Sequence, residues 1–163
     1  MPTQTLAGSR HEDFLALAVK LALDNVQNEC GRPFGAVLVK DRVIVATGVN
    51  TILASGDPTA HAELEAIRSA ARAQHSTRLD DHIVYASGHP CPMCLAAMYL
   101  TGIREIYYAY SNEDGEPYGL STREIYAELA KPLSAQSIQL RHLPLSGSGP
   151  GPYEAWRESQ RQP

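Results

Sequence analysis

The sequence predicts an α/β protein, a three-layer α/β/α sandwich with a mixed five-stranded sheet and helices on both faces. Two observations lead to this class. Short apolar runs typical of strands alternate with longer segments whose apolar residues recur at helical spacing. The segments follow the order helix, strand, strand, helix, strand, helix, strand, which gives a sheet covered by helices on two sides.

The first helix is expected over residues 11–28, where Phe14, Leu17, Ala18 and Leu21 lie on one side. A short turn joins the first two strands as a hairpin. The five expected strands cover 34–40, 43–49, 83–87, 103–109 and 137–140.

Capping signals mark the two helices between the later strands. Asp57 or Thr59 is expected to be the N-cap of a helix that runs to about Gln74. Pro90 fits the entry of the next helix, over about 91–101, because a missing N–H costs little there.

The part of the chain after the fourth strand is less regular. Residues 110–121 are polar and rich in glycine, and we expect a loop near the mouth of the site. A helix is expected over 122–130. After a flexible linker at 146–152, residues 153–163 are expected to form a C-terminal helix and tail.

Length and composition limit the possible classes. A chain of 163 residues that is 44% hydrophobic is expected to form a single domain over 1–163, with a loose start over 1–10. The net charge of −4 argues against a nucleic-acid partner, which usually requires a basic face. Three cysteines, no signal-peptide pattern and no long apolar run favour the cytoplasm and no membrane.

Four residues are candidates for a catalytic metal site. His61 and Glu63 form an H-x-E motif, and Cys91 and Cys94 follow in a P-C-x-x-C motif. A catalytic zinc ion takes three protein ligands and leaves its fourth position to water, so His61, Cys91 and Cys94 are the candidate ligands of one zinc ion per chain. The bound water has its pKa lowered to about 7. Glu63 is the candidate that moves its proton.

Two other interpretations of these residues remain open. A C-x-x-C pair alone is also typical of redox proteins. A closed structural zinc site needs a fourth protein ligand, and Cys30 is the remaining cysteine. We expect Cys30 to be a small buried or loop residue.

The sequence resembles the cytidine deaminase superfamily, and within it the bacterial guanine deaminases, over about residues 12–160. The residues that carry the resemblance are at 33–37, 48–50, 57–63, 90–95 and 155–157. H-x-E combined with P-C-x-x-C is the signature of zinc deaminases. The resemblance implies hydrolytic deamination of a small aminated nucleobase, with guanine converted to xanthine and ammonia as the first choice. It also implies a homodimer.

The same resemblance implies substrate contacts. Asn50 corresponds to the residue that hydrogen-bonds the base, Phe34 to the aromatic that packs on the ring, and the N–H of Ala62 to a donor for a ring carbonyl. His89 and Tyr118 are further candidates that would shape the pocket.

Three departures from the pattern concern the substrate. His89 stands where the family often has glutamate, Ser121 and Thr122 stand where guanine deaminases have an acidic residue, and no aromatic follows Trp156 at the matching place. The open alternatives are therefore another aminated heterocycle or nucleoside, such as cytosine, guanosine or cytidine. A tRNA adenosine deaminase and a non-catalytic zinc-stabilised module are the others.

Overall fold

A computed structural model of the chain describes residues 10–29, 31–145, 149 and 151–161. The chain divides into two compact units, residues 1–130 and 131–163. Cys30 and most of the expected linker lie outside the described residues. That the whole chain forms one domain stays a prediction.

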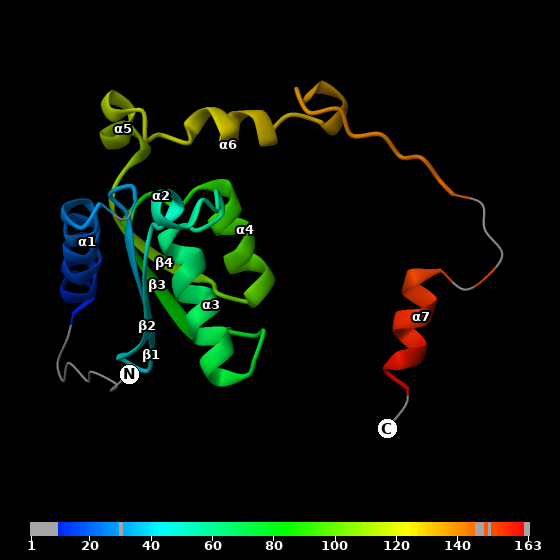
Figure 1. Cartoon of the computed structure of the whole chain (residues 1–163), viewed down its shortest axis with the longest axis horizontal. Helices are drawn as coiled ribbons and strands as arrows, with labels where there is room; N and C mark the ends of the chain where they lie inside the picture. Colours follow the sequence, from blue (N-terminus) through cyan, green and yellow to red (C-terminus); the bar gives the residue numbers. More distant parts are fainter. Residues whose placement is uncertain (1–9, 30, 146–148, 150, 162–163) are drawn as a thin grey trace. The chain divides into compact units, whose positions relative to one another are not determined.

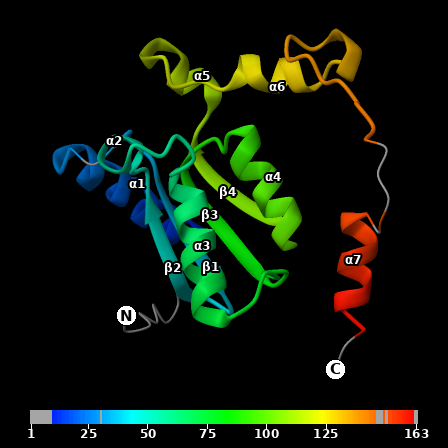
Figure 2. The ribbon, with the colours of Figure 1, turned by 45° about the vertical axis from the view of Figure 1, so that its right-hand side comes forward.

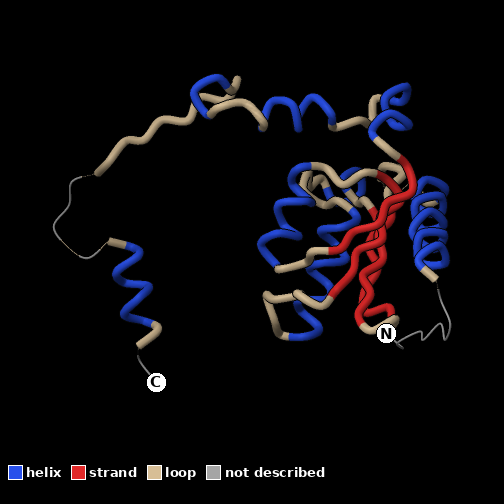
Figure 3. Tube along the Cα trace, turned by 180° about the vertical axis from the view of Figure 1, so that it is seen from behind, coloured by secondary structure: helices blue, strands red, loops and turns tan. Residues whose placement is uncertain are grey.

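The first unit contains a sheet, whose strands are red in Figure 3, and the strand order is β2-β1-β3-β4. Strand β1 is antiparallel to both of its neighbours, and β3 is parallel to β4, so the sheet is mixed. The strands are β1 (Gly35–Lys40), β2 (Val43–Val49), β3 (His82–Gly88) and β4 (Glu105–Tyr110). The helical elements are α1 (His11–Gln27), α2 (Ile52–Ser55), α3 (Ala62–Gln74), α4 (Pro92–Thr101), α5 (Asn112–Gly115), η1 (Glu116–Tyr118) and α6 (Arg123–Leu129).

Helices cover both faces of the sheet, as predicted. Helix α1 lies on one face, and α3 and α4 lie on the other (Figures 1 and 2). Successive side chains of a strand point to opposite faces. Val37 and Val39 of β1 therefore pack with Phe14 of α1, whereas Ala36 and Leu38 join the core formed with α3 and α4.

The prediction of a fifth strand is wrong. The described residues form a sheet of four strands, and residues 137–140 are not among them. Ile138 and Leu140 satisfy an alternating pattern, but they are 73% and 74% exposed. A strand needs a neighbour that takes up its backbone N–H and C=O groups, and two alternating side chains do not supply one.

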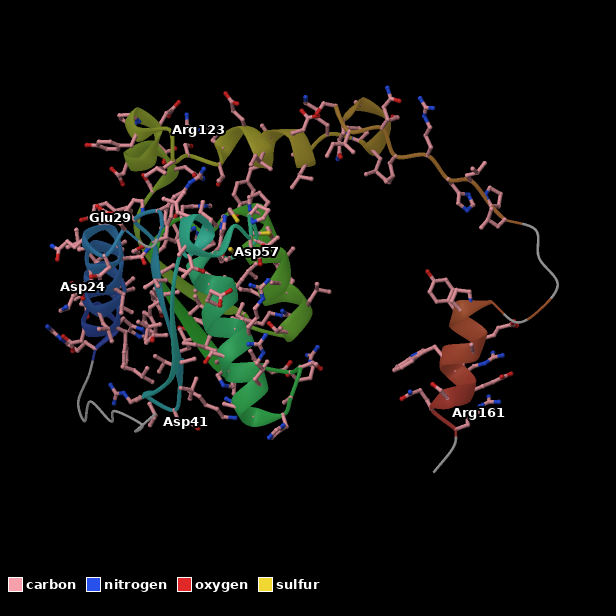
Figure 4. The ribbon with its side chains drawn as sticks, viewed as in Figure 1. Asp24, Glu29, Asp41, Asp57, Arg123 and Arg161 are labelled. Carbon is pink, nitrogen blue, oxygen red and sulfur yellow. The ribbon has the colours of Figure 1, made fainter. Side chains whose placement is uncertain are left out.

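Helices α3 and α4 each begin at the residue that follows a candidate metal ligand. The N-cap of α3 is His61 rather than Asp57 or Thr59. The Asp57 carboxylate instead accepts from the Thr59 N–H and hydroxyl at 2.7 Å each, and so closes the turn before the helix (Figure 4). Cys91 is the N-cap of α4, and Pro92 is its first residue. His61 and Cys91 therefore occupy equivalent positions.

A glycine allows α3 to start against the sheet. A Cβ atom at Gly48 of β2 would lie 2.1 Å from the carbonyl oxygen of Ala62. No real Cβ approaches a backbone atom so closely, so a larger residue at this position would displace the start of α3. Because Glu63 follows Ala62, this close approach also holds Glu63 in its buried position beside the sheet.

The second unit consists of η2 (Leu133–Ala135), α7 (Pro152–Ser159) and the segments around them. Helix α7 overlaps the segment 153–163, for which the sequence predicted a C-terminal helix and tail. All described residues of this unit are exposed except Gln136, which is half-buried. Its exposed large apolar residues are Leu133, Ile138, Leu140, Leu143, Leu145, Tyr153 and Trp156. Among the helices that the structure describes, none combines the length and apolar character needed to cross a membrane.

Candidate active site

Three ligand atoms converge where α3 and α4 begin. The Cys91 Sγ lies 3.4 Å from the His61 Nδ1 and 3.5 Å from the Cys94 Sγ, and the Cys94 Sγ lies 3.7 Å from the His61 Nδ1. Tetrahedral zinc, with bonds of about 2.0–2.3 Å, places its ligand atoms roughly 3.5–3.8 Å apart. The residues present therefore fit one zinc ion. Within the described ranges, this is the one group of three such side chains that could hold a metal.

The electrostatics of the thiols favour metal binding. The hydrogen bond between the Cys91 and Cys94 sulfur atoms, followed by the one between Cys91 and His61, lowers the pKa of Cys91 to about 4. The same bond between the cysteines raises the pKa of the Cys94 thiol. A lowered pKa favours the thiolate, the form in which Cys91 would bind a metal, and Cys94 would lose its proton on binding the same cation.

Glu63 lies beside the three ligand atoms. Its side chain is buried, with the residue 6% exposed, and its Oε2 lies 3.5 Å from the Cys94 Sγ. Burial raises the pKa of Glu63. A carboxyl group whose pKa is moved toward neutrality both accepts and releases a proton readily, which suits a proton shuttle.

Asn50 is fully buried and keeps one donor free. Its Oδ1 accepts from the N–H groups of Arg32 (3.1 Å) and Ile52 (3.3 Å), which fixes the amide orientation. Its Nδ2 is buried without a partner among the described residues. The next residue, Thr51, donates its N–H to the carbonyl of Ala60, immediately before His61. A fixed, unpaired amide donor is therefore tied to the loop that carries the metal ligand.

The N–H of Ala62 is a second donor at this place. Ala62 is the first residue of α3 and is fully buried. The first N–H groups of a helix have no acceptor within it, so this one remains available to a ligand.

The remaining predicted substrate residues line a separate cavity. Phe34, His89 and Tyr118 border a space of about 240 Å³ together with residues of α1 and α5. His61, Glu63, Cys91 and Cys94 do not line it. Tyr118 is 78% exposed. The predicted site residues therefore form two groups, one at the metal ligands and one around this cavity.

The His89 ring makes contacts within the protein. It packs edge-on against Tyr108 of β4 at 4.8 Å and against Tyr126 of α6 at 5.4 Å between ring centroids. Its Nδ1 lies 3.0 Å from the carbonyl oxygen of Pro90, which assigns the Nδ1–H tautomer because a carbonyl only accepts. These contacts hold the loop that leads to Cys91.

The acidic residues of the segment 110–121 have partners of their own. This segment, predicted as a loop, contains the short elements α5 and η1. Arg123 pairs with Glu113 at 2.5 Å and with Glu116 at 3.3 Å (Figure 4). Asp114 accepts from the Ser111 N–H at 2.8 Å.

Ser121 and Thr122, where the resemblance led us to expect an acidic residue, both contact the side-chain amide of Asn112. The Oδ1 of Asn112 accepts from the Thr122 N–H at 2.9 Å, and the hydroxyl groups of Ser121 and Thr122 approach the same oxygen. The hydroxyl groups at these two positions are therefore engaged by the amide of Asn112.

Sequence reasoning missed Tyr126. Its hydroxyl donates to the carbonyl of Pro90 at 2.6 Å, and burial raises the pKa of Tyr126 to about 12, so that the phenol keeps its proton. A tyrosine in a short helix 32 residues after Cys94 carries no local signal of such a contact. Only the fold brings α6 to the metal loop.

An α/β sandwich that joins an imidazole, two thiols and a buried carboxylate at two helix N-termini defines a zinc-dependent hydrolytic deaminase. The chain belongs to the cytidine and deoxycytidylate deaminase family, since the profile of that family's zinc-binding region matches residues 8–110.

Relatives within this group differ in their substrates. The chain is 43% identical over 147 residues to the guanine deaminase of Bacillus subtilis (strain 168), covering 90% of this chain and 94% of that protein. The X-ray structure of guanine deaminase from Bacillus subtilis superposes with a TM-score of 0.83 at 42% identity, covering 92% and 95% of the two chains. A tRNA-specific adenosine deaminase of Buchnera aphidicola (subsp. Schizaphis graminum) is 33% identical over 110 residues, or 67% of this chain and 72% of that protein.

Proposed function

We propose that this enzyme hydrolyses the exocyclic amine of a small free nucleobase, with guanine the first candidate, and releases xanthine and ammonia. The observation that carries the chemistry is the buried Glu63 carboxylate beside the three metal-ligand atoms. The choice of guanine rests on the 43% identity to the guanine deaminase of Bacillus subtilis.

In this proposal His61, Cys91 and Cys94 bind the zinc ion. Bound zinc would lower the pKa of a coordinated water to about 7 and so supply hydroxide at neutral pH. Glu63 would move a proton from the attacking water to the departing nitrogen of the base. A single group serves both steps because its burial disfavours a permanent charge.

The substrate contacts are proposals on the same basis. The free Nδ2 of Asn50 and the N–H of Ala62 donate to carbonyl groups or ring nitrogens of the base. The ring of Phe34, half-buried against the core, offers an apolar surface for the flat ring. His89 and Tyr118 border the neighbouring cavity and would limit what extends beyond the base.

The first test is a screen for ammonia release on guanine, adenine and cytosine, on guanosine, adenosine and cytidine, and on a tRNA substrate. We expect guanine to give the highest kcat/KM and each free base to exceed its nucleoside. Nucleosides that react at least as fast as every free base would overturn the free-base proposal. Turnover of tRNA alone would favour the tRNA deaminase alternative, which the net charge of −4 opposes.

The role of Asn50 is tested by Asn50→Asp. The new carboxylate still accepts from the backbone of Arg32 and Ile52 but replaces the free donor with an acceptor. Leaving a buried polar group of the substrate unpaired costs about 1–3 kcal/mol, so kcat/KM should fall roughly 5- to 150-fold. Steady-state kinetics measure this loss. Asn28→Asp, the same exchange at the C-cap of α1, should leave kcat/KM unchanged. Equal kinetics for both variants would remove Asn50 from substrate binding.

We also propose a homodimer. Helices α4 and α6 expose large apolar side chains, and the described residues of the second unit form no core of their own. Apolar surface of this kind is typical of a protein interface. Light scattering at micromolar concentration should give twice the mass of one chain, and the mass of a single chain would contradict the proposal.

A further inference from the structure

Two hydrogen-bond donors converge on one carbonyl oxygen next to the metal ligands. The Tyr126 hydroxyl donates to the carbonyl of Pro90 at 2.6 Å, and the His89 Nδ1 lies 3.0 Å from the same oxygen. This carbonyl belongs to the peptide bond that joins Pro90 to Cys91. The orientation of that peptide plane sets the direction in which the backbone enters Cys91, the N-cap of α4.

Ring packing adds to this arrangement. The His89 ring is held edge-on between Tyr108 and Tyr126, and the His89 N–H donates to the carbonyl of Tyr110 at 2.8 Å. Strand β4 and helix α6 therefore both contact the loop before Cys91. Helix α6 lies beyond residues 8–110, which match the family profile.

Pro90 has no N–H to donate, so its carbonyl is the only backbone group through which this residue can be fixed. A side chain that fixes a carbonyl next to a ligand acts on the metal indirectly, by keeping the ligand atom where the ion needs it. Partners that hydrogen-bond a metal ligand directly typically change metal affinity or activity by about 10- to 100-fold when they are removed, so we expect an effect at the lower end of that range for a partner that acts through the backbone.

We infer that Tyr126 is a positioning residue of the metal centre, whose hydroxyl holds the Pro90 carbonyl and thereby keeps the Cys91 thiolate within reach of zinc. The inference rests on the zinc site and not on the identity of the base. It assigns α6 a role in catalysis although no α6 side chain is a metal ligand.

The test is Tyr126→Phe, which keeps the ring beside His89 and removes only the hydroxyl. Zinc release is followed with an excess of a chromophoric chelator, in the absence of substrate. We expect release about 10-fold faster than from the unchanged protein. With substrate, kcat should fall while KM stays the same, because the hydroxyl contacts the ligand loop rather than the base.

Tyr107→Phe is the matched control. The Tyr107 hydroxyl donates to Glu105 at 2.6 Å and its ring packs in the cluster with Phe14 of α1, so the same atom is removed without touching the loop before Cys91. Its zinc release and kcat should equal those of the unchanged protein. Unchanged zinc release from Tyr126→Phe, or an equal acceleration in both variants, would overturn the inference. A rise in KM with kcat unchanged would do the same, since it would place the hydroxyl at the substrate.

A second variant tests the shared carbonyl. His89→Phe keeps an aromatic ring between Tyr108 and Tyr126 but removes the other donor to Pro90. Because either donor can hold the oxygen when the other is lost, the double variant should release zinc faster than the product of the two single effects predicts. Effects that simply multiply would mean that the two residues act independently, and this outcome would contradict the shared-carbonyl account.

The readout keeps this inference separate from the proposed substrate. Zinc release does not depend on which ring is deaminated, so a failed guanine assay leaves the result intact. Conversely, an enzyme active on guanine with unchanged zinc release from Tyr126→Phe would support the proposed function and overturn the role of Tyr126.

Discussion

Glu63→Gln is expected to abolish nearly all ammonia release while the zinc ion stays bound. The amide has the shape of the carboxyl group, but it neither accepts the proton of water nor delivers one to the leaving nitrogen. General acid–base catalysis by one residue is worth roughly 10²–10⁴-fold, and Glu63 serves in two proton transfers, so kcat should fall by at least about 10²-fold. Zinc content should remain one per chain, because the three ligand atoms are on other residues.

The matched control is Glu65→Gln, two residues further along α3. Glu65 is half-exposed and pairs with Arg68 at 2.6 Å. An exposed pair of this kind contributes about 0–1 kcal/mol to stability, so its loss should leave kcat unchanged. Ammonia release from Glu63→Gln at the rate of the unchanged enzyme would remove Glu63 from the mechanism. Loss of zinc from the same variant would instead make Glu63 part of the metal site.

Cys94→Ser is expected to empty the metal site. The Cys94 Sγ is fully buried between the Cys91 Sγ and the His61 Nδ1, and a neutral serine hydroxyl binds zinc poorly compared with a thiolate. Metal analysis of the purified variant should give about 0.1 zinc per chain or less, against about one in the unchanged protein. Deamination should be lost together with the zinc. The midpoint of thermal unfolding should fall as well, because bound metal stabilises only the folded state.

Cys30→Ser is the control for the loss of a thiol. From the sequence, Cys30 is not expected to bind the metal, so this variant should keep one zinc per chain and full activity. Full zinc occupancy in Cys94→Ser would contradict the assignment of the ligands. Loss of zinc in Cys30→Ser would instead favour the closed structural site that the sequence left open.

The amino-acid sequence by itself was enough to predict the layers of helices and sheet and the candidate metal ligands. Apolar periodicity located α1, α3 and α4, and short apolar runs located β1 to β4 within a few residues. The sequence pointed to the three candidate ligands and Glu63 because these residue types rarely occur in this combination and because each motif spans only a few residues. His61 and Glu63 lie two residues apart, and Cys91 and Cys94 lie three apart on the first turn of one helix. Patterns of such short range can be recognised in the sequence without a structure.

The contacts around the metal loop were decided only by the tertiary structure. Tyr126 meets Pro90 across 36 residues, and no periodicity links two positions so far apart. His89 borders the cavity, and it also packs between Tyr108 and Tyr126 because strand β4 runs parallel to β3 and brings its end beside the loop.

The same reasoning explains the missing strand and the free donor. Residues 137–140 have an alternating pattern, but a strand exists only where a neighbour offers hydrogen bonds, and this is a property of the fold. The orphaned Nδ2 of Asn50 is likewise visible only once the Arg32 and Ile52 N–H groups occupy the other end of the amide. Local patterns determine which elements form and which ligands are possible. Long-range packing decides which side chains those elements hold in place, because it depends on residues that the local pattern does not include.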